Sequence, residues 1–281
     1  MSRMIRVSGN VGRSQYFSIS NVEISSLNEG FQMDDRVVVI TGGGQGIGRV
    51  FAHAFAKAGA TSVIAELNAD AGEAVAKEIR SAGGQAFSVV TDIGEEESTL
   101  ALSAAVLKRC GRIDVLINNA GIFSTIKMRP FTEISLEEWN QVLHVNITGV
   151  FLATRAVVPA MKAQNFGRVI NISSAAVSMG RPGYLHYIAS KSALLGMSRS
   201  MAHELGAEGI TVNSILPGAT ETEIERATVT PEQKQAMLAM RCVARAETPE
   251  DLVGTALFLA SPSSAFLTGQ SLTVDGGLTH L

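Results

Sequence analysis

Tyr187 and Lys191 have side chains that could move a proton, and they stand i, i+4 at the start of an apolar stretch. On a helix this spacing places both side chains on one face. An adjacent ammonium stabilises a phenolate, so it lowers a tyrosine pKa that starts near ~10. Such a phenol can serve as general acid or base near neutral pH, an effect of about 10²–10⁴ in rate. The pair is also common on solvated helices, and Tyr184 is a weaker candidate because it lies two turns from the lysine.

A glycine-rich loop over residues 41–48 (TGGGQGIG) separates an apolar run from a helical segment. A strand-to-helix turn of this kind gathers backbone N–H groups and the positive end of a helix, which together bind pyrophosphate. Glycine is needed there because a Cβ would block close approach and disfavour positive φ. The spacing of Gly42, Gly46 and Gly48 differs from the G-x-G-x-x-G fingerprint, and it is not a P-loop. A tight turn that binds nothing is the alternative.

Glu66 adds a second part to this nucleotide motif, because it ends the next predicted strand, 18 residues after Gly48. A carboxylate at that position can accept hydrogen bonds from both ribose hydroxyls of an adenosine. It would also repel a 2′-phosphate, and the adjacent Leu67 offers no positive charge. The pattern therefore favours NAD over NADP, with a solvated strand-end glutamate as the alternative.

Further polar residues follow the third and fourth predicted strands. Asp92 ends one of these strands, and residues 118–121 (NNAG) end the other. Ligands of open α/β sheets bind outside the carboxyl ends of the strands, so we expect these residues to line one rim. Asn118 has two readings that remain open: a structural amide that joins neighbouring strand ends, or a direct cofactor contact.

The elements that must position these residues alternate between short apolar runs and helices. Strands are predicted at 36–41, 61–66, 85–91, 113–118, 168–173, 211–216 and 271–274, and helices at 49–58, 70–82 and 95–110, with further helices between the later strands. This alternation predicts a parallel sheet with helices on both faces, in one domain over residues 33–281. Residues 1–32 read as an added segment outside the fold.

Composition excludes several classes of function. Of the 281 residues, 46% are apolar and 17% are charged, which is an ordinary globular balance. The net charge of -3 provides no basic surface that would bind nucleic acid or an anionic membrane. The sequence has no apolar run long enough to predict a membrane span. Two distant cysteines and five histidines without ligand spacing predict no disulfide framework and no metal site, and they favour a cytoplasmic location.

The chain resembles the short-chain dehydrogenase/reductase family from about Met33 to His280. The resemblance rests on short motifs in a fixed order: residues 41–48, Asp92, residues 118–121, Asn146, Ser173-Ser174, Tyr187 with Lys191, Pro217-Gly218, and the ending 268–270 with 274–277. It implies a Rossmann-like, doubly wound parallel sheet of about seven strands and an NAD(P)-dependent oxidoreductase. The family is commonly a homotetramer, so the resemblance also implies that assembly.

The resemblance implies a catalytic tetrad. Tyr187 would be the general acid or base, and Lys191 would bind the nicotinamide ribose and lower the pKa of the tyrosine. Ser174 would hydrogen-bond the substrate oxygen; it is preferred over Ser173 because it lies 13 residues before Tyr187, the usual family spacing. Asn146 would hold a water that connects the lysine to solvent. A hydride would move between the nicotinamide and a carbinol carbon, with no metal needed.

The resemblance also implies which residues contact the NAD cofactor. They are Gly42, Gln45, Gly46, Ile47, Gly48, Glu66, Asp92, Ile93, Asn119, Ala120, Gly121, Tyr187, Lys191, Pro217, Gly218, Thr220 and Thr222. Substrate contacts are expected from segments 122–130, 175–186 and 219–245, of which the last is long enough for a lid. Phe123, Met179, Tyr184 and His186 are the candidates, and a packed or solvated imidazole is the alternative for His186. The apolar residues of these segments suggest a medium-sized, partly apolar carbonyl compound.

Three functions are consistent with these observations. The first is an NAD-dependent oxidoreductase that interconverts a small-molecule secondary alcohol and its ketone. A 3-oxoacyl-thioester (acyl carrier protein) reductase is the alternative within the family, and Glu66 argues against it because that activity usually uses NADP. A non-catalytic NAD-sensing protein is the alternative from another class, and the presence of Ser174, Tyr187 and Lys191 argues against it.

Overall fold

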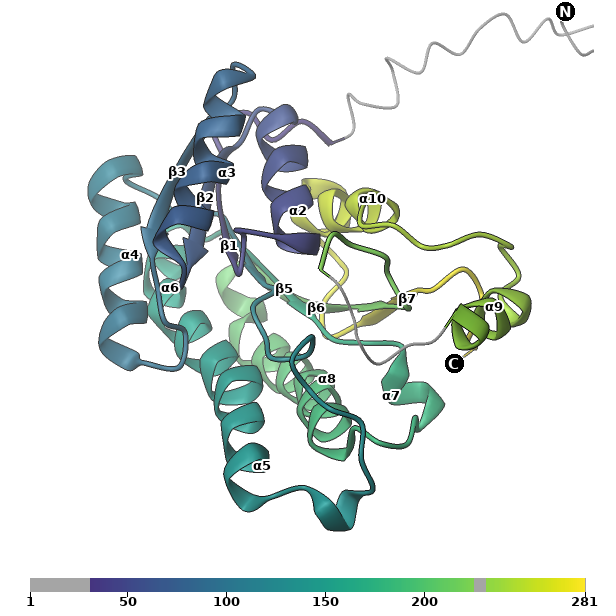
Figure 1. The fold of residues 1–281 in the computed structure, drawn as a ribbon. Coiled ribbons are helices and arrows are strands. Elements are labelled where there is room, and N and C mark those ends of the chain that lie inside the picture. Colours follow the sequence, from purple (N-terminus) through teal and green to yellow (C-terminus); the bar gives the residue numbers. More distant parts are fainter. Residues whose placement is uncertain (1–30, 225–230, 281) are drawn as a thin grey trace, which may run out of the picture.

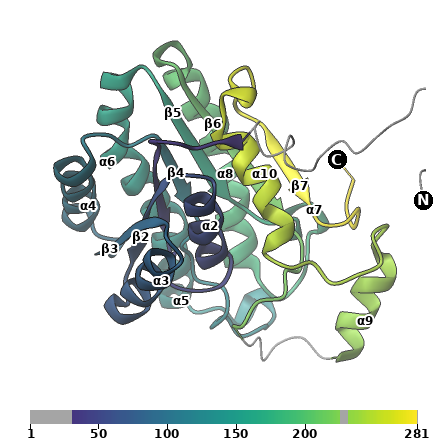
Figure 2. The same cartoon turned by 90° about the horizontal axis from the view of Figure 1, so that it is seen from above.

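One parallel sheet with helices on both faces forms the structure, a computed structural model that describes residues 31–224 and 231–280 (Figures 1 and 2). Seven strands lie in the order β3-β2-β1-β4-β5-β6-β7, and every neighbouring pair is parallel. This confirms the predicted doubly wound sheet. The strands are β1 (Val37–Thr41), β2 (Thr61–Glu66), β3 (Gln85–Val90), β4 (Val115–Asn118), β5 (Gly167–Ile172), β6 (Ile210–Pro217) and β7 (Ser271–Val274).

The direction of winding reverses beside β1, and this reversal creates the crevice. From β1 the chain runs outward through β2 to β3, then returns to the other side of β1 with β4. Val39 of β1 therefore pairs with Val63 of β2 on one side and with Leu116 of β4 on the other. At such a switch point the connections leave in opposite directions, so a ligand site opens outside the carboxyl ends of β1 and β4.

The helices fall into two layers that bury separate apolar clusters. They are α2 (Gly46–Lys57), α3 (Ala69–Ser81), α4 (Glu96–Cys110), α5 (Leu136–Leu143), α6 (Gly149–Gln164), α7 (Ala176–Met179), α8 (Leu185–Leu205), α9 (Pro231–Met240) and α10 (Glu250–Ala260). Helices α2, α3 and α10 cover one face of the sheet, and α4, α6 and α8 cover the other (Figures 1 and 2). All five residues of β1 are buried because both of its faces are covered.

Helix α2 begins three residues before the predicted start at residue 49. The reason is that the last turn of the glycine loop, from Gly46, is already the first turn of the helix. The long segment 219–245, expected to be helix-like, contains helix only at α9 within its described part. Residues 225–230 of that segment lie outside the described residues, as does all of the expected extension 1–32 except Phe31 and Gln32.

Within the described chain, one continuous helical stretch, Leu136–Gln164, is long and apolar enough to cross a membrane. The mean hydropathy of its most apolar 18-residue window is 1.4. Half of its most apolar window is buried inside the fold. Its second part, α6, packs on β4, β5 and α4, so the stretch is a core helix of the domain. A π-helical turn, His144–Thr148, joins α5 to α6 and carries Asn146 into the interior.

Candidate active site

A cavity of about 590 Å³ opens at the carboxyl ends of the parallel strands. Its walls come from the glycine loop, the ends of β2 to β6, the start of α8 and the chain end near Leu278. Most of the expected site residues line it: Gly42, Gln45, Gly46, Ile47, Glu66, Asp92, Ile93, Asn119, Ala120, Gly121, Phe123, Ser174, Met179, Tyr184, Tyr187, Lys191, Pro217, Gly218, Thr220 and Thr222. Gly48, Asn146 and His186 are not among the described residues of its wall.

The glycine loop follows β1 and requires glycine for steric reasons. Gly42 and Gly46 have φ of 62° and 55°, in the left-handed region that favours glycine. A Cβ on Gly42 would lie 2.9 Å from the Cα of Ala120, so the loop packs directly on the end of β4. A Cβ on Gly48 would lie 2.2 Å from the carbonyl oxygen of Gly42. Gly48 therefore allows the loop to close on itself and does not face the cavity.

The N-terminus of α2 carries an acidic contact that the sequence pattern does not signal. The backbone N–H of Gly46 donates to Oε1 of Glu223 at 2.8 Å. Backbone donors at a helix N-terminus are the groups that bind a dinucleotide pyrophosphate. The carboxylate of Glu223 and a bound phosphate would therefore compete for this donor.

Glu66 lies at the end of β2 with its carboxylate fixed against the glycine loop. Oε2 accepts the N–H of Gly44 at 3.0 Å, and Oε1 accepts the N–H of Asn68 at 3.1 Å. A Cβ on Gly44 would lie 2.9 Å from Oε2, so glycine lets the carboxylate reach the loop. This arrangement holds one negative charge on the cavity wall beside the loop that would bind phosphates.

The ends of β1 and β4 are joined by Thr41 and Asn119. Oγ1 of Thr41 accepts the N–H groups of Asn119 and Ala120 at 3.0 and 3.1 Å. Nδ2 of Asn119 donates to the carbonyls of Thr41 and Gly42, both at 3.0 Å. These contacts shape the floor of the cavity.

Asn118 has the structural role that was one of its two readings. It is buried and does not line the cavity, among the residues that the structure describes. Its Nδ2 donates to Oδ1 of Asn171 at 2.8 Å and to Oγ1 of Thr154 at 3.0 Å. The amide thus joins β4 to β5 and α6, beneath the cavity.

Tyr187 and Lys191 lie in the first two turns of α8, both nearly buried. The lysine Nζ lies 5.9 Å from the centre of the tyrosine ring and donates to the carbonyl of Ile172 at 2.8 Å. Burial lowers the pKa of Lys191 from 10.5 to about 8, so the ammonium is still the main form at neutral pH. The ring of Phe123 lies 4.5 Å from that of Tyr187, centre to centre, and adds an apolar neighbour.

The two serines after β5 have different partners. Oγ of Ser173 donates to the carbonyl of Lys191 at 2.7 Å, which attaches β5 to α8. Oγ of Ser174 accepts the N–H of Ala176 at 3.2 Å, and Ser174 lines the cavity with Tyr187. The hydroxyl of Ser173 is thus committed to the helix, which favours Ser174 as the residue that meets a substrate.

Asn146 supports the site from behind its wall. Oδ1 accepts the N–H of Ile122 at 2.7 Å, and Nδ2 donates to the carbonyl of Ile122 and to Oγ of Ser190, each at 3.1 Å. A Cβ on Gly121 would lie 3.1 Å from this Oδ1 and 3.4 Å from Nζ of Lys191. Asn146 therefore fixes the turn at 121–122 close to the lysine, and its expected role in holding a water stays a prediction.

His186 has the packed position that was the alternative to a substrate contact. Its side chain is fully buried, with Nε2 3.3 Å from Oε1 of Glu138 on α5. Adjacent residues on a helix point about 100° apart, so a histidine next to Tyr187 cannot share its face. The structure instead adds wall residues that no short motif signalled: Gln141, Val145, Arg181, Ile224 and Leu278.

Metal ligation has no candidate among residues 31–224 and 231–280. No group of three or more His, Cys, Asp or Glu side chains within these ranges is arranged to hold a metal ion. The donor set of the cavity is a glycine loop, carboxylates at the strand ends, and a hydroxyl–phenol–ammonium group. These groups fit a dinucleotide at one end and an alcohol or carbonyl at the other.

Known proteins similar to this chain include several dehydrogenases and reductases. A family profile described as enoyl-(acyl carrier protein) reductase matches residues 42–279. The 7α-hydroxysteroid dehydrogenase of Escherichia coli (strain K12) is 36% identical over 250 residues, which cover 89% of this chain and 96% of that protein. A 3-oxoacyl-(acyl-carrier-protein) reductase of Synechocystis is 38% identical over 247 residues, which cover 86% of this chain and 96% of that protein.

Two solved structures carry the comparison into three dimensions. A 7α-hydroxysteroid dehydrogenase complexed with NADH and 7-oxoglycochenodeoxycholic acid has a TM-score of 0.84 at 36% identity, covering 89% of this chain and 96% of that chain. A protein from Beutenbergia cavernae, assigned as an NAD(P)-dependent gluconate 5-dehydrogenase and holding NADP at low occupancy, has a TM-score of 0.82 at 37% identity, covering 89% of this chain and 98% of that chain.

Proposed function

The chain belongs to the short-chain dehydrogenase/reductase family, and from that premise we propose that it interconverts a secondary alcohol and its ketone with NAD. One observation carries this proposal. A single cavity is lined at one end by the glycine loop and Glu66, and at the other by Ser174, Tyr187 and Lys191. When bound, the nicotinamide cofactor accepts or supplies the hydride.

The protein's own residues supply the proton path and the orientation. Tyr187 takes the proton from the alcohol oxygen or returns it to the carbonyl oxygen. The buried ammonium of Lys191 favours the phenolate form of Tyr187, and its pKa of about 8 keeps it charged at neutral pH. Ser174 hydrogen-bonds the same substrate oxygen, so the reacting carbon is held in one orientation.

The preference for NAD is the part of the proposal that rests on Glu66. Its carboxylate is held by two backbone N–H groups, so it cannot easily turn away from a ribose 2′-phosphate. Relatives of known structure hold NADH in one case and NADP in the other, so the family as a whole accepts both. Charge repulsion at Glu66 favours NAD in this chain.

The substrate is expected to be a medium-sized alcohol or ketone with apolar surface, because Phe123, Met179 and Tyr184 line the catalytic end. A 3-oxoacyl-thioester reductase is the second candidate, and the Synechocystis relative favours it. Glu66 opposes that activity where it depends on NADP. An NAD-sensing protein without turnover would have no use for the complete set of Ser174, Tyr187 and Lys191.

Assembly as a homotetramer and a cytoplasmic location complete the proposal. Large apolar side chains are exposed on α6 and α8, the two long helices that we expect to pair between subunits. Phe151 on α6 is 46% exposed, and Leu185 on α8 is 44% exposed. Sedimentation equilibrium of the purified chain tests the assembly, and a monomer at micromolar concentration would contradict it.

The decisive experiment is a spectrophotometric assay with NAD and NADP against a panel of cyclic and open-chain secondary alcohols, with an acetoacetyl thioester in the reverse direction. We expect oxidation of one or more alcohols with a higher kcat/KM for NAD than for NADP. Thioester reduction with NADPH alone would favour the second candidate. Cofactor binding without turnover on any substrate would favour the sensing protein.

A further inference from the structure

The loop that follows β6, residues 217–222, borders the catalytic end of the cavity. All of its residues except Glu221 line the cavity wall. After Pro217 it belongs to no helix or strand, and among the described residues its one tie to the strand ladder is the N–H of Gly218, which donates to the carbonyl of Val274 in β7 at 3.0 Å. Contacts from elsewhere in the chain must therefore determine where its backbone lies.

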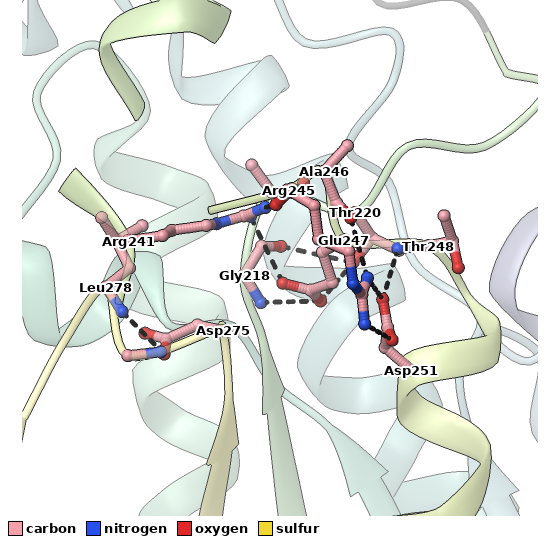
Figure 3. Close-up of polar contacts among 12 residues, drawn as sticks. Gly218, Thr220, Arg241, Arg245, Ala246, Glu247, Thr248, Asp251, Asp275 and Leu278 are labelled. Carbon is pink, nitrogen blue, oxygen red and sulfur yellow. Dashed lines mark hydrogen bonds and ion pairs between the residues drawn. The ribbon is translucent and has the colours of Figure 1, made fainter. Parts of the chain in front are cut away.

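Glu247 supplies several of these contacts from behind the loop (Figure 3). Oε1 accepts the N–H of Gly218 at 3.1 Å and the hydroxyl of Thr220 at 2.8 Å. The backbone carbonyl of Glu247 accepts the N–H of Glu221 at 2.7 Å. A Cβ on Gly218 would lie 2.4 Å from Oε2, so the carboxylate is pressed against the loop backbone.

Arg241 completes the arrangement from the residue after α9. Nη2 donates to the carbonyl of Ala219 at 3.1 Å and lies 3.4 Å from Oε2 of Glu247 (Figure 3). Nη1 donates to the carbonyl of Arg245 at 3.1 Å. The side chains of Arg241 and Glu247 are only 3% and 5% exposed, so this is a buried ion pair.

A buried ion pair contributes little to stability, because desolvation offsets most of the attraction between the charges. Burial accordingly raises the pKa of Glu247. What the pair does achieve is geometric: its two side chains bond the N–H of Gly218, the carbonyl of Ala219 and the hydroxyl of Thr220. These contacts hold the loop that lines the cavity in one position.

We propose that Glu247 and Arg241 are positioning residues, which together set loop 217–222 against the nicotinamide end of the cofactor. The kinetic consequence of this inference rests on the proposed function. The hydrogen-bonded arrangement itself does not depend on that function. The inference assigns a role to two residues that are not among those lining the cavity and that no sequence motif identified.

The test uses graded variants of the full chain. Glu247→Gln keeps an oxygen acceptor for Gly218 and Thr220 but removes the charge that faces Arg241. Glu247→Leu removes both. Asp114→Asn is the matched control, because Asp114 is a fully buried carboxylate that accepts a backbone N–H and pairs with arginines, but at the amino end of β4.

Hydrogen exchange measured by mass spectrometry on the peptide that contains residues 217–222 gives the first readout, without cofactor. We expect Glu247→Leu to accelerate exchange there by at least about tenfold, Glu247→Gln by less, and Asp114→Asn not at all. Unchanged exchange in a folded Glu247→Leu protein would overturn the proposal, and so would equal acceleration in the Asp114→Asn control.

Kinetics give the second readout. We expect Glu247→Leu to lower kcat by about tenfold or more while the Kd for NAD changes by less than about threefold, because only the reacting end is displaced. The primary isotope effect from an alcohol deuterated at its carbinol carbon should rise, and Glu247→Gln should recover most of kcat. Parallel losses of kcat and NAD affinity, matched by Asp114→Asn, would show a merely structural role and overturn it.

Failure of the proposed function is distinguishable from failure of this inference. If the wild-type chain oxidises no alcohol, the exchange measurement and the emission of bound NADH still report on the loop. A change of emission in Glu247→Leu but not in Asp114→Asn supports the positioning role in that case. Identical emission in all three proteins would overturn it.

Discussion

The two ends of the cavity are built from different amounts of chain. The adenosine end, defined by residues 42–48 and Glu66, comes from one continuous βαβ unit, and its main contacts join β1, β2 and the loop between β1 and α2. The catalytic end, defined by Ser174, Tyr187, Lys191 and loop 217–222, comes from separate segments after β5, α7 and β6. It is held by Asn146, Arg241 and Glu247, which belong to further elements: the turn before α6, the residue after α9 and the segment before α10.

Under the proposed function, this difference should separate binding from rate. Side chains at the adenosine end would meet a part of the cofactor that does not react, so their loss should change affinity and cofactor choice. Side chains at the catalytic end would meet the reacting atoms, so their loss should change kcat with less effect on cofactor affinity. Three substitutions test this separation, and a fourth tests the buried ammonium at the catalytic end.

Tyr187→Phe should have the largest effect. Removal of the phenol hydroxyl takes away the proton-transfer group, so kcat should fall by about 10²–10⁴-fold. The ring contact with Phe123 is retained, and the Kd for NAD from calorimetric titration should be almost unchanged. Retained turnover would contradict the assigned role of Tyr187, and lost NAD binding would contradict the separation of the two ends.

Lys191→Met tests the cost of the buried ammonium through stability. The folded pKa of about 8 lies below the ordinary 10.5, so the unfolded chain binds more protons between these values. The free energy of unfolding of the wild type should therefore increase relative to that of the variant as pH rises from 8 to 10.5.

The lowered pKa of Lys191 corresponds to a change of about 3 kcal/mol in the free energy of unfolding. Below pH 8 the buried ammonium destabilises the wild type by this full amount, which is then constant with pH. Urea titrations of both proteins at pH 7, 8.5 and 9.5 measure it. Parallel stability curves across this range would show that Lys191 is not desolvated as the structure indicates. The variant should also lose turnover.

Glu66→Gln tests the adenosine end. The amide oxygen can still accept the N–H of Gly44, but the negative charge that opposes a 2′-phosphate is gone. The ratio of kcat/KM for NADP to that for NAD should rise by about tenfold, the size of one lost charge–charge contact. At saturating NAD, kcat should be unchanged. A change in kcat without a change in cofactor choice would contradict the expectation that the adenosine end controls cofactor binding and the catalytic end controls rate.

Glu223→Gln should have the smallest effect and the opposite sign. The carboxylate accepts the N–H of Gly46 at 2.8 Å, where a phosphate would bind, so its neutralisation should tighten NAD binding by about threefold. Glu97→Gln, an exposed glutamate in the first turn of α4, is the control. Weaker NAD binding in Glu223→Gln would show that this carboxylate does not compete with the cofactor.

Much of the fold and of the site could be predicted because the signals are local. The glycine loop, Glu66 and the Tyr187–Lys191 spacing each lie within one or two adjacent elements, and the alternation of strands and helices is a short-range pattern. The choice of Ser174 over Ser173 agrees with the partners found in the structure, since Ser173 is bonded to the carbonyl of Lys191. The sequence could not decide between the two roles of Asn118, because a structural amide and a cofactor contact both need the same residue type.

Other residues could not be assigned without the packing. The sequence left a substrate contact and a packed imidazole open for His186, and the structure shows the packed position, on a face of α8 that contacts α5 and Glu138. Leu278 joins the cavity wall because the carboxylate of Asp275 accepts its N–H at 3.1 Å and turns the chain end inward. The contact of His186 with Glu138 joins residues 48 positions apart, and no spacing rule encodes it.

The amino-acid sequence by itself determined the parallel sheet, its crevice and the residue types at both ends of the cavity, because periodicity, glycine stereochemistry and helical spacing act over a few residues. Only the tertiary structure decided which face each helix turns to the cavity, that Glu223 meets the N-terminus of α2, and that Arg241 and Glu247 hold loop 217–222. Burial and long-range hydrogen bonds made those choices, and both exist only once the layers have packed.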